Sequence, residues 1–357
     1  MERTKNNKSL AAQIKSHSQK KVEPKEYDGD IDNVISTGST LLNLAISGGR
    51  RRGGGIPGGV IVEIFGPPSI GKTSLICEVA GGVQREGGEL RFYDPEGRLS
   101  SNFAKIFDLQ LSKEEIKHPK TPLDIFPPLR DWQPKNPNLI NGIFIDSIAS
   151  LMSDLELENK KDEYSRVAKL FSQELRKSSI PIAEKKFIVM AANQLRQKVG
   201  MTGFGEKYDT PCGEAWKFYA SLRLKATKAN PYKLKQKITF RGKEIEEVIG
   251  TVLDIYVYKS SIWVGHHSAA VYLLNDYGID DIRANLMYLK QYGRKAKKPD
   301  GTDYSGYSLN GDKLGVGIDD ALSIIEKDRR FLELKEAVID LWEEIQVHFK
   351  VTRKKER

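Results

Sequence analysis

A loop of the type that binds phosphate groups stands at residues 66–73, which read GPPSIGKT. The segment matches G-x-x-x-x-G-K-[S/T]: Gly66 and Gly71 permit backbone angles that other residues resist, and the loop N–H groups converge on phosphate oxygens. Lys72 would reach the β- and γ-phosphates of a nucleotide, and the Thr73 hydroxyl would hold Mg²⁺. The predicted nucleotide-binding residues are Gly66, Pro67, Pro68, Ser69, Ile70, Gly71, Lys72, Thr73 and Ser74.

The flanking segments fit this motif. An apolar run, VIVEIF (60–65), leads into the loop, and a helix-like run, KTSLICEVAGGV (72–83), leads out of it. Strand, loop and helix in that order are the arrangement that a phosphate-binding loop needs. A glycine-rich turn with a surface lysine is the simpler alternative, and the flanking segments favour the nucleotide site.

Two acidic segments supply groups that nucleotide hydrolysis also requires. Asp146 closes the apolar run GIFI (142–145), which predicts a carboxylate near the Mg²⁺ ion. Asp94 and Glu96 follow another apolar run, and residues two apart on an extended segment point the same way. Glu96 is the candidate base that takes a proton from the attacking water. A solvated strand end remains the alternative explanation for each carboxylate.

A fourth apolar run, KFIVMAAN (186–193), is followed by Gln194. A side-chain amide at that point can bond a γ-phosphate or its water, and its geometry changes once phosphate leaves. Gln194 is therefore a candidate link between the nucleotide and the long segment that begins beside it. Through Gln194, the nucleotide state would switch that segment between order and disorder. A polar residue that only caps the strand fits this position equally well.

The apolar runs also predict the fold class. Runs of strand length lie at 60–65, 90–94, 142–147, 186–193, 221–226 and 253–258. The first four are nearly continuous in apolar residues, as expected for strands buried on both faces. Helix-length segments separate them, and one places Val167, Leu170, Phe171 and Leu175 on a single stripe. We therefore predict an α/β fold with a mostly parallel central sheet flanked by helices.

Composition divides the chain into parts. Residues 1–33 are polar and basic, and we interpret them as an arm or oligomerisation segment that only a partner would order. The α/β pattern occupies 34–277, whereas 278–350 indicate a small α+β C-terminal lobe, before a basic tail at 351–357. Within the lobe, 307–315 predict a turn or hairpin. A later helix places Leu334, Val338, Leu341, Trp342 and Ile345 on one face.

Two insertions interrupt the pattern. Residues 48–59, GGRRRGGGIPGG, predict a flexible basic loop. Residues 118–138 carry six prolines and predict an irregular surface excursion.

Charge and cysteine content narrow the class of protein. The 357 residues carry a formal net charge of +9, which favours polyanionic partners, with basic clusters that include 225–237 and 290–298. No apolar run is long enough to span a membrane, and the first residues lack the apolar core of a secretory signal. Cys77 and Cys212 have no disulfide-framework or metal spacing, so we expect reduced thiols in a cytosol-like compartment.

Several segments together resemble the RecA recombinase family over roughly residues 34–277, with a weaker trace in the C-terminal lobe. They read ISTGSTLLNLAISGG, GPPSIGKTSL, YDPEG, IDSIASL, AKLFSQELRK, NQLRQKVGMTGFGE and CGEAWKFYASLRL. The resemblance implies a RecA-type ATPase core that uses ATP and Mg²⁺ and polymerises on single-stranded DNA as a helical homo-oligomeric filament. It also implies strand exchange with homologous duplex DNA, and a cytoplasmic role in DNA repair and the SOS response. A mediator or single-strand-binding protein would be a further partner.

The same resemblance assigns roles to residues near the nucleotide. Glu96 falls on the catalytic carboxylate of the family, and Gln194 falls on its switch glutamine. Asp146 and Ser147 match the second nucleotide motif, with Asp146 and Thr73 at the metal. Phe103 stands where the family has a tyrosine that stacks on adenine.

The resemblance also implies where DNA and the neighbouring subunit bind. Residues 153–166 match the first DNA-binding loop, and residues 195–213 match the second. The implied DNA-binding residues are Lys169, Arg176, Lys177, Arg196, Lys198, Met201 and Phe204, the last two as apolar wedges between bases. Lys217, Phe218 and Arg223 match subunit-interface positions, and Lys259 resembles a lysine that contacts the neighbouring subunit's ATP.

The chain departs from the family pattern at several positions. Ser261 replaces a second lysine, Ser100 stands where an acidic residue is frequent near the adenine, and the tail VTRKKER is basic rather than acidic. The departures indicate a divergent member, with a phage or a mobile element among the sources that fit. They also put the rate of ATP hydrolysis in question.

Three other interpretations stay open from the sequence. A ring-forming RecA-fold motor, such as a helicase, would share the phosphate loop and the parallel sheet. A non-catalytic DNA-binding paralogue of a recombinase would fit Ser261 and the basic tail. A small-molecule kinase is disfavoured because no lid segment with clustered arginines is evident.

Overall fold

The computed structural model describes residues 31–151, 164–197, 208–210, 213–351 and 353. For residues 164–166, 196, 197, 208, 209 and 213 it describes the backbone alone. The predicted arm at 1–33 therefore lies almost wholly outside the described residues, as do most of the two predicted DNA-binding loops and most of the tail.

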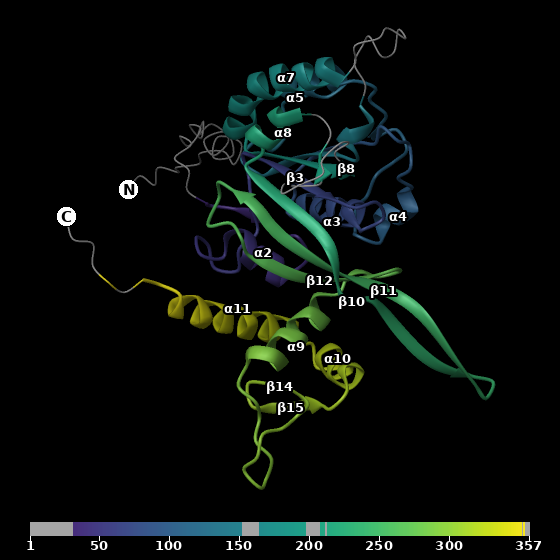
Figure 1. Cartoon of the computed structure of the whole chain (residues 1–357), viewed down its shortest axis with the longest axis vertical. Coiled ribbons are helices and arrows are strands. Elements are labelled where there is room, and N and C mark those ends of the chain that lie inside the picture. Colours follow the sequence, from purple (N-terminus) through teal and green to yellow (C-terminus); the bar gives the residue numbers. More distant parts are fainter. Residues whose placement is uncertain (1–30, 152–163, 198–207, 211–212, 352, 354–357) are drawn as a thin grey trace, which may run out of the picture. The chain divides into compact units, whose positions relative to one another are not determined.

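A nine-stranded sheet forms the centre of the fold (Figure 1), in the order β13-β12-β11-β10-β3-β7-β6-β4-β5. Neighbours from β10 to β5 pair in parallel, and those from β10 to β13 pair antiparallel. The predicted α/β fold with a mostly parallel sheet is confirmed. The strands are β3 (Val60–Gly66), β4 (Leu90–Tyr93), β5 (Ile116–Lys117), β6 (Asn141–Ile145), β7 (Phe187–Gln194), β10 (Leu222–Phe240), β11 (Lys243–Ser260), β12 (Ser268–Leu274) and β13 (Gly278–Ile279).

Buried apolar residues cover both faces of the sheet, as the continuous apolar runs predict. In β3, Val62 and Ile64 join one apolar cluster and Ile61 joins another, because successive side chains point to opposite faces. Helices α2 (Thr40–Ser47) and α3 (Lys72–Arg85) contribute to the first cluster. Helices α5 (Phe126–Asp131), α7 (Tyr164–Glu184) and α8 (Gly213–Tyr219) contribute to the second.

The prediction of a surface excursion at residues 118–138 is wrong. The segment forms the 3₁₀ helix η1 (Pro122–Asp124) and helix α5, and the side chains of Ile125, Phe126 and Leu129 are fully buried. Prolines are compatible with the first turn of a helix, where their missing N–H group would have no partner anyway. The insertion is therefore part of the core on the α7 side of the sheet.

A matched pair of substitutions tests this assignment. Phe126→Ala should destabilise the protein by roughly 3–5 kcal/mol, because Phe126 is fully buried and packs against Phe171 and Trp216. Leu123→Ala, in η1 of the same insertion, removes a side chain that is 37% exposed and should cost about 0.5 kcal/mol. Thermal unfolding of both variants measures the two losses of stability. If both losses are small and equal, the insertion does not belong to the core.

The prediction of a flexible loop at residues 48–59 is also wrong. Each of its three arginines donates to a different part of the chain: Arg50 to the Ile262 carbonyl, Arg51 to the Ile31 and Asp32 carbonyls, and Arg52 to helix α11 (Phe331–His348). On α11, Arg52 binds carboxylates about one helical turn apart. These belong to Glu336, Asp340 and Glu343. Within the same segment, β2 (Ile56–Pro57) pairs antiparallel with β1 (Val34–Ile35), so the segment has a defined backbone course.

The C-terminal segment has its own small apolar cluster, in which Leu286, Leu309, Leu314, Ile325 and Leu334 are buried. It consists of α9 (Asp281–Tyr292), the hairpin β14 (Tyr307–Leu309) and β15 (Asp312–Gly315), α10 (Ile318–Lys327) and α11. The predicted hairpin and the predicted helix are confirmed, whereas the exact domain boundaries stay a prediction. None of the helices in the described part of the chain combines the length and the apolar character that crossing a membrane requires.

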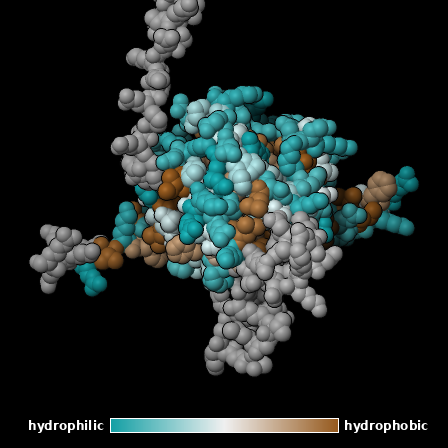
Figure 2. Space-filling view, turned by 90° about the horizontal axis from the view of Figure 1, so that it is seen from above, coloured by the Kyte–Doolittle hydropathy of each residue, from teal (hydrophilic) through white to brown (hydrophobic). Residues whose placement is uncertain are grey.

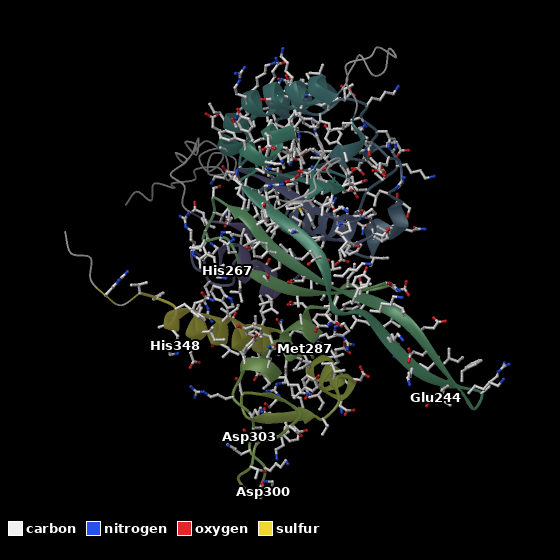
Figure 3. The ribbon with its side chains drawn as sticks, in the orientation of Figure 1. Glu244, His267, Met287, Asp300, Asp303 and His348 are labelled. Atoms are coloured by element: carbon white, nitrogen blue, oxygen red, sulfur yellow. The ribbon has the colours of Figure 1, made fainter. Side chains whose placement is uncertain are left out.

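Strands β10 and β11 extend past the sheet as a two-stranded ribbon (Figure 1). β10 pairs with β3 only over Leu222–Lys225, and β11 pairs with β12 only over Gly250–Tyr256. A two-residue turn at Arg241 and Gly242, both with positive φ, joins the strands and matches their twist. Glu244 lies near the outer end of the ribbon (Figure 3). Ile238 and Phe240 in β10 are exposed. Hydrophobic residues lie among hydrophilic ones on the face of the molecule that Figure 2 shows.

Candidate active site

The phosphate loop lies between β3 and α3, as the flanking segments predict. Gly71 caps α3 with a left-handed φ of 94° and offers no side-chain hydrogen bond to the helix start. The backbone N–H groups of Lys72 and Thr73 open the helix and have no acceptor in a preceding turn. Together with the positive end of the helix dipole, this makes an anion-binding site.

Gly66 is required for a different reason from the predicted one. It is the last residue of β3 and is not among the residues with positive φ. A Cβ atom at Gly66 would lie 2.5 Å from the Ala226 carbonyl oxygen. A glycine is needed there because another strand comes close, whereas Gly71 is needed for its backbone angle.

Lys72 turns its ammonium group back into the loop. Its Nζ donates to the carbonyl oxygens of Gly66 at 3.0 Å and Pro67 at 2.7 Å. The side chain is only 8% exposed, and this burial lowers the pKa of Lys72 although the charges of Asp146 and Glu96 oppose the shift. An ammonium group held by loop carbonyls at this place is ready to exchange them for phosphate oxygens, which compensate its charge better.

Thr73 and Asp146 form a pair of oxygen ligands suited to Mg²⁺. The Thr73 hydroxyl donates to Asp146 Oδ2 at 2.5 Å, which brings the start of α3 and the end of β6 together. Burial raises the pKa of Asp146, although the Thr73 hydrogen bond opposes it. Among the described residues no three His, Cys, Asp or Glu side chains form a metal cage. One hydroxyl and one carboxylate suit Mg²⁺, which commonly completes its shell with water and substrate phosphates.

Glu96 lies where several strand ends meet. Its Oε1 accepts hydrogen bonds from the hydroxyls of Ser150 at 2.6 Å and Ser147 at 3.0 Å, and the Gln194 amide nitrogen lies 3.5 Å away. Its Oε2 lies 2.9 Å from the Arg98 guanidinium. Burial alone raises the pKa of Glu96, but the hydroxyl donors and nearby cations outweigh it, so the pKa is lowered and the side chain is a carboxylate. The structure thus brings Glu96, Ser147 and Gln194 together, as the resemblance implies.

Asp94 shapes the turn that carries Glu96. Its buried carboxylate accepts from the backbone N–H groups of Glu96 at 3.2 Å and Leu99 at 2.8 Å. The Asp94 carbonyl oxygen lies 2.8 Å from Nδ1 of His118, the first residue of the proline-rich insertion. Asp94 is therefore a structural support for Glu96, because its carboxylate holds the backbone of the turn on both sides of Gly97.

The predicted subunit-interface residues gather in one place. Arg223 and Lys259 are cross-strand partners in β10 and β11. Nζ of Lys259 donates to the carbonyl oxygens of Lys217 and Phe218 at 2.8 Å each, at the C-terminal end of α8. Phe218 is 74% exposed, so this patch offers a large apolar side chain at the surface. Contact with a neighbouring subunit or its ATP stays a prediction for all four residues.

Arg223 is the member of this group whose surroundings the sequence does not reveal. It is buried, pairs with the fully buried Glu63 carboxylate of β3, and lies over the Phe65 and Tyr258 rings. Asn193 donates to the other Glu63 oxygen at 2.7 Å and accepts from the Gln194 N–H at 2.9 Å. A polar network thus runs from Arg223 to Gln194. Glu63 has no sequence signal beyond being a single charge within an apolar strand.

Phe103 and Ser100 lie at the short helix α4 (Ser101–Lys105). The Ser100 hydroxyl caps this helix by accepting from the Phe103 N–H at 3.1 Å. The Phe103 ring packs against Phe107, with centroids 5.3 Å apart. Ser100 therefore has a local structural role, and stacking of Phe103 on adenine stays a prediction.

The predicted DNA-binding residues are described only in part. Lys169, Arg176 and Lys177 are exposed on α7, and Lys177 pairs with Glu174. The backbone of Arg196 lies in β8 (Arg196–Gln197), which pairs with β9 (Tyr208–Asp209) and joins the two ends of the second predicted loop. Lys198, Met201 and Phe204 lie outside the described residues, as do 153–163 of the first loop.

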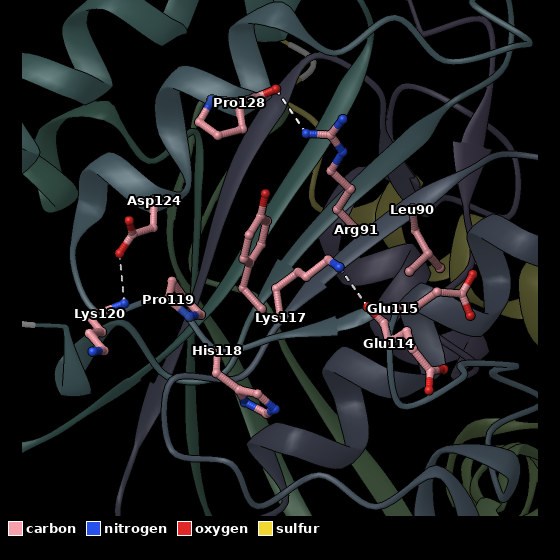
Figure 4. A pocket seen from close by; sticks show the side chains of 11 residues that line it. Leu90, Arg91, Glu114, Glu115, Lys117, His118, Pro119, Lys120, Asp124 and Pro128 are labelled. Atoms are coloured by element: carbon pink, nitrogen blue, oxygen red, sulfur yellow. Dashed lines mark hydrogen bonds between the residues drawn. The ribbon is translucent and has the colours of Figure 1, made fainter.

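A separate cavity of about 810 Å³ opens beside the edge strand β5 (Figure 4). Arg91 and Lys117 line it, but they donate to the Pro128 and Glu114 carbonyl oxygens at 2.9 Å and 2.7 Å. No predicted nucleotide-binding residue lines this cavity, so it is distinct from the phosphate loop.

Comparison with known proteins agrees with this arrangement. The family model of the RecA N-terminal domain matches residues 12–280. Protein RecA of Acholeplasma laidlawii is 29% identical over 331 residues, 90% of this chain and 88% of that protein. Protein RecA of Delftia acidovorans is 30% identical over 306 residues, 83% of this chain and 75% of that protein. Protein RecA of Synechococcus elongatus is 31% identical over 303 residues, 84% and 78% of the two chains. The chain belongs to the RecA family.

Proposed function

We propose that this protein is a DNA-dependent ATPase that polymerises on single-stranded DNA and promotes pairing and strand exchange with homologous duplex DNA. The observation that carries the proposal is the convergence of Lys72, the Thr73–Asp146 pair and the Glu96–Gln194 pair near the carboxyl ends of the parallel strands β3, β4, β6 and β7. Membership of the RecA family supports the same activity.

Each residue of this site has its own role in the hydrolysis of ATP. The open start of α3 and the Lys72 ammonium bind the β- and γ-phosphates of ATP. Thr73 and Asp146 would hold Mg²⁺, which neutralises charge on the phosphate oxygens. Glu96 accepts a proton from the attacking water, and Gln194 orients that water or the γ-phosphate. The gain in rate comes from charges that are already in place.

Gln194 also connects the nucleotide to the DNA-binding segment. It is the last residue of β7, and the β8–β9 ladder that closes the second predicted loop begins two residues later. A change at the γ-phosphate that moves Gln194 therefore acts directly on the base of that loop. We infer that ATP tightens the grip on single-stranded DNA in this way, and that hydrolysis relaxes it.

Electron microscopy with single-stranded DNA and a slowly hydrolysed ATP analogue tests the assembly. We expect helical filaments, and closed rings would favour a ring-forming motor instead. A strand-exchange assay between circular single-stranded DNA and a homologous duplex tests the reaction. DNA binding without joint molecules would favour a non-catalytic paralogue.

Arg196→Ala tests the second loop as a phosphate-binding element. Removal of one cation that contacts a phosphate should weaken binding to single-stranded DNA and reduce the slope of log K against log salt concentration by about one. Titrations at several salt concentrations measure the slope. Lys327→Ala, an exposed lysine of α10, is the matched control and should leave it unchanged. An unaltered slope for Arg196→Ala would show that Arg196 does not contact a phosphate of the DNA.

A further inference from the structure

Glu96, the base in the proposed function, has one very close neighbour with no assigned role. The hydroxyl of Ser150 donates to Glu96 Oε1 at 2.6 Å, which is closer than Ser147 at 3.0 Å or Gln194 at 3.5 Å. The Arg98 partner of Oε2 is 82% exposed and therefore weakly held. Of the described residues, Ser150 thus makes the shortest hydrogen bond to the carboxylate.

Local structure holds the Ser150 hydroxyl at this position. Ser147 precedes the 3₁₀ helix η2 (Ile148–Ser150), in which residues three apart lie above one another. The two hydroxyl oxygens are accordingly 3.4 Å apart and converge on the same carboxylate oxygen. Ile148 and Leu151 are buried on either side of Ser150, so the short helix cannot turn freely. The spacing S-x-x-S is the sequence signal for this arrangement.

These contacts occupy the atoms that a general base needs. A carboxylate offers about four lone-pair positions. Here Oε1 faces the Ser147, Ser150 and Gln194 donors, and Oε2 faces Arg98. Oε1 therefore faces more donors than it has lone pairs, and it can accept a proton from water only after one of these donors moves away. A hydroxyl donor stabilises the charged carboxylate, and the lowered pKa of Glu96 agrees with that effect even though burial raises it.

We propose that Ser150 is a positioning residue that holds Glu96 in a resting arrangement, so that ATP hydrolysis at full rate requires the Ser150–Glu96 hydrogen bond to open. The inference rests on the proposed function, in which Glu96 is the base and DNA stimulates hydrolysis. Within it, the bond limits turnover when DNA is absent. In this role Ser150 acts on the carboxylate and leaves nucleotide binding to the phosphate loop.

Two variants of the full-length chain test the inference. Ser150→Ala removes the donor, and Ser150→Thr keeps a hydroxyl at the same carbon. ATP turnover is measured for each with and without saturating single-stranded DNA. Without DNA we expect Ser150→Ala to raise kcat about tenfold, from the usual strength of a hydrogen bond to a charged group, while KM for ATP stays the same. With DNA, kcat should match that of the unaltered protein.

The controls separate this role from a structural one. Ser150→Thr should retain the low DNA-independent kcat, and Ser305→Ala, an exposed serine of the C-terminal lobe, should change neither rate. Lower turnover of Ser150→Ala with and without DNA would overturn the inference, because Ser150 would then support the productive arrangement. An unchanged kcat would overturn it as well. If the unaltered protein hydrolyses no ATP under either condition, the proposed function itself fails.

Discussion

Lys72→Ala should abolish ATP turnover, with kcat/KM falling by at least a factor of about 10²–10³. Lys72 is the cation at the start of α3, only 8% exposed, and its Nζ already lies among the carbonyl oxygens of the phosphate loop. Alanine removes that charge and also leaves the Gly66 and Pro67 carbonyls without their donor. Steady-state release of phosphate, with and without single-stranded DNA, measures the loss.

The control for Lys72→Ala is Lys113→Ala, which removes an exposed lysine far along the chain from the loop. It should hydrolyse ATP at the unaltered rate. A direct measurement of nucleotide binding by Lys72→Ala distinguishes a lost site from a lost fold, when it is combined with a thermal melt. Hydrolysis by Lys72→Ala at the ordinary rate would place the phosphate site elsewhere in the protein.

The second large effect is expected from Glu96→Gln. Glutamine has nearly the same shape but cannot accept a proton from water, so kcat should fall about 10²–10⁴-fold. The phosphate loop is untouched, so KM for ATP and the assembly of filaments on single-stranded DNA should remain. Because Gln offers an amide in place of one carboxylate oxygen, the Ser147 and Ser150 hydroxyls can still find an acceptor.

Turnover and filament formation must be measured on the same preparation of Glu96→Gln. Filaments that form with ATP but do not disassemble are the expected picture, because hydrolysis no longer releases the DNA. Asp319→Asn, which neutralises an exposed carboxylate of α10, is the matched control. Retention of ordinary turnover by Glu96→Gln would show that another group accepts the proton.

The central sheet could be predicted because its signal is local. The runs that become β3, β6 and β7 are apolar at almost every position, and each strand is buried on both faces. The order of strand, loop and helix likewise predicts Lys72 and Thr73 at the start of α3, from a stretch of about twenty residues. The chemistry near the nucleotide is thus encoded in short segments.

The contacts between distant segments could not be predicted from such patterns. Arg52 finds its three carboxylates on α11 almost 300 positions later, and three arginines among glycines otherwise suggest a solvated loop. Phe126 and Leu129 are buried with side chains of α7 and α8, which lie far along the chain, whereas the prolines between them suggest a surface segment. The role of Ser150 could not be predicted either, because it depends on a 3₁₀ turn and on the position of Glu96.

The ribbon of β10 and β11 has a consequence for how members of the family can differ in size. From Lys235 on one strand and Val248 on the other to the turn, the two strands pair only with each other. Addition or removal of two residues on each strand keeps every side chain on its own face, because side chains alternate between the two faces of a strand every second residue. Evolution can therefore lengthen or shorten the ribbon in such steps without altering the nine-stranded sheet or the nucleotide site.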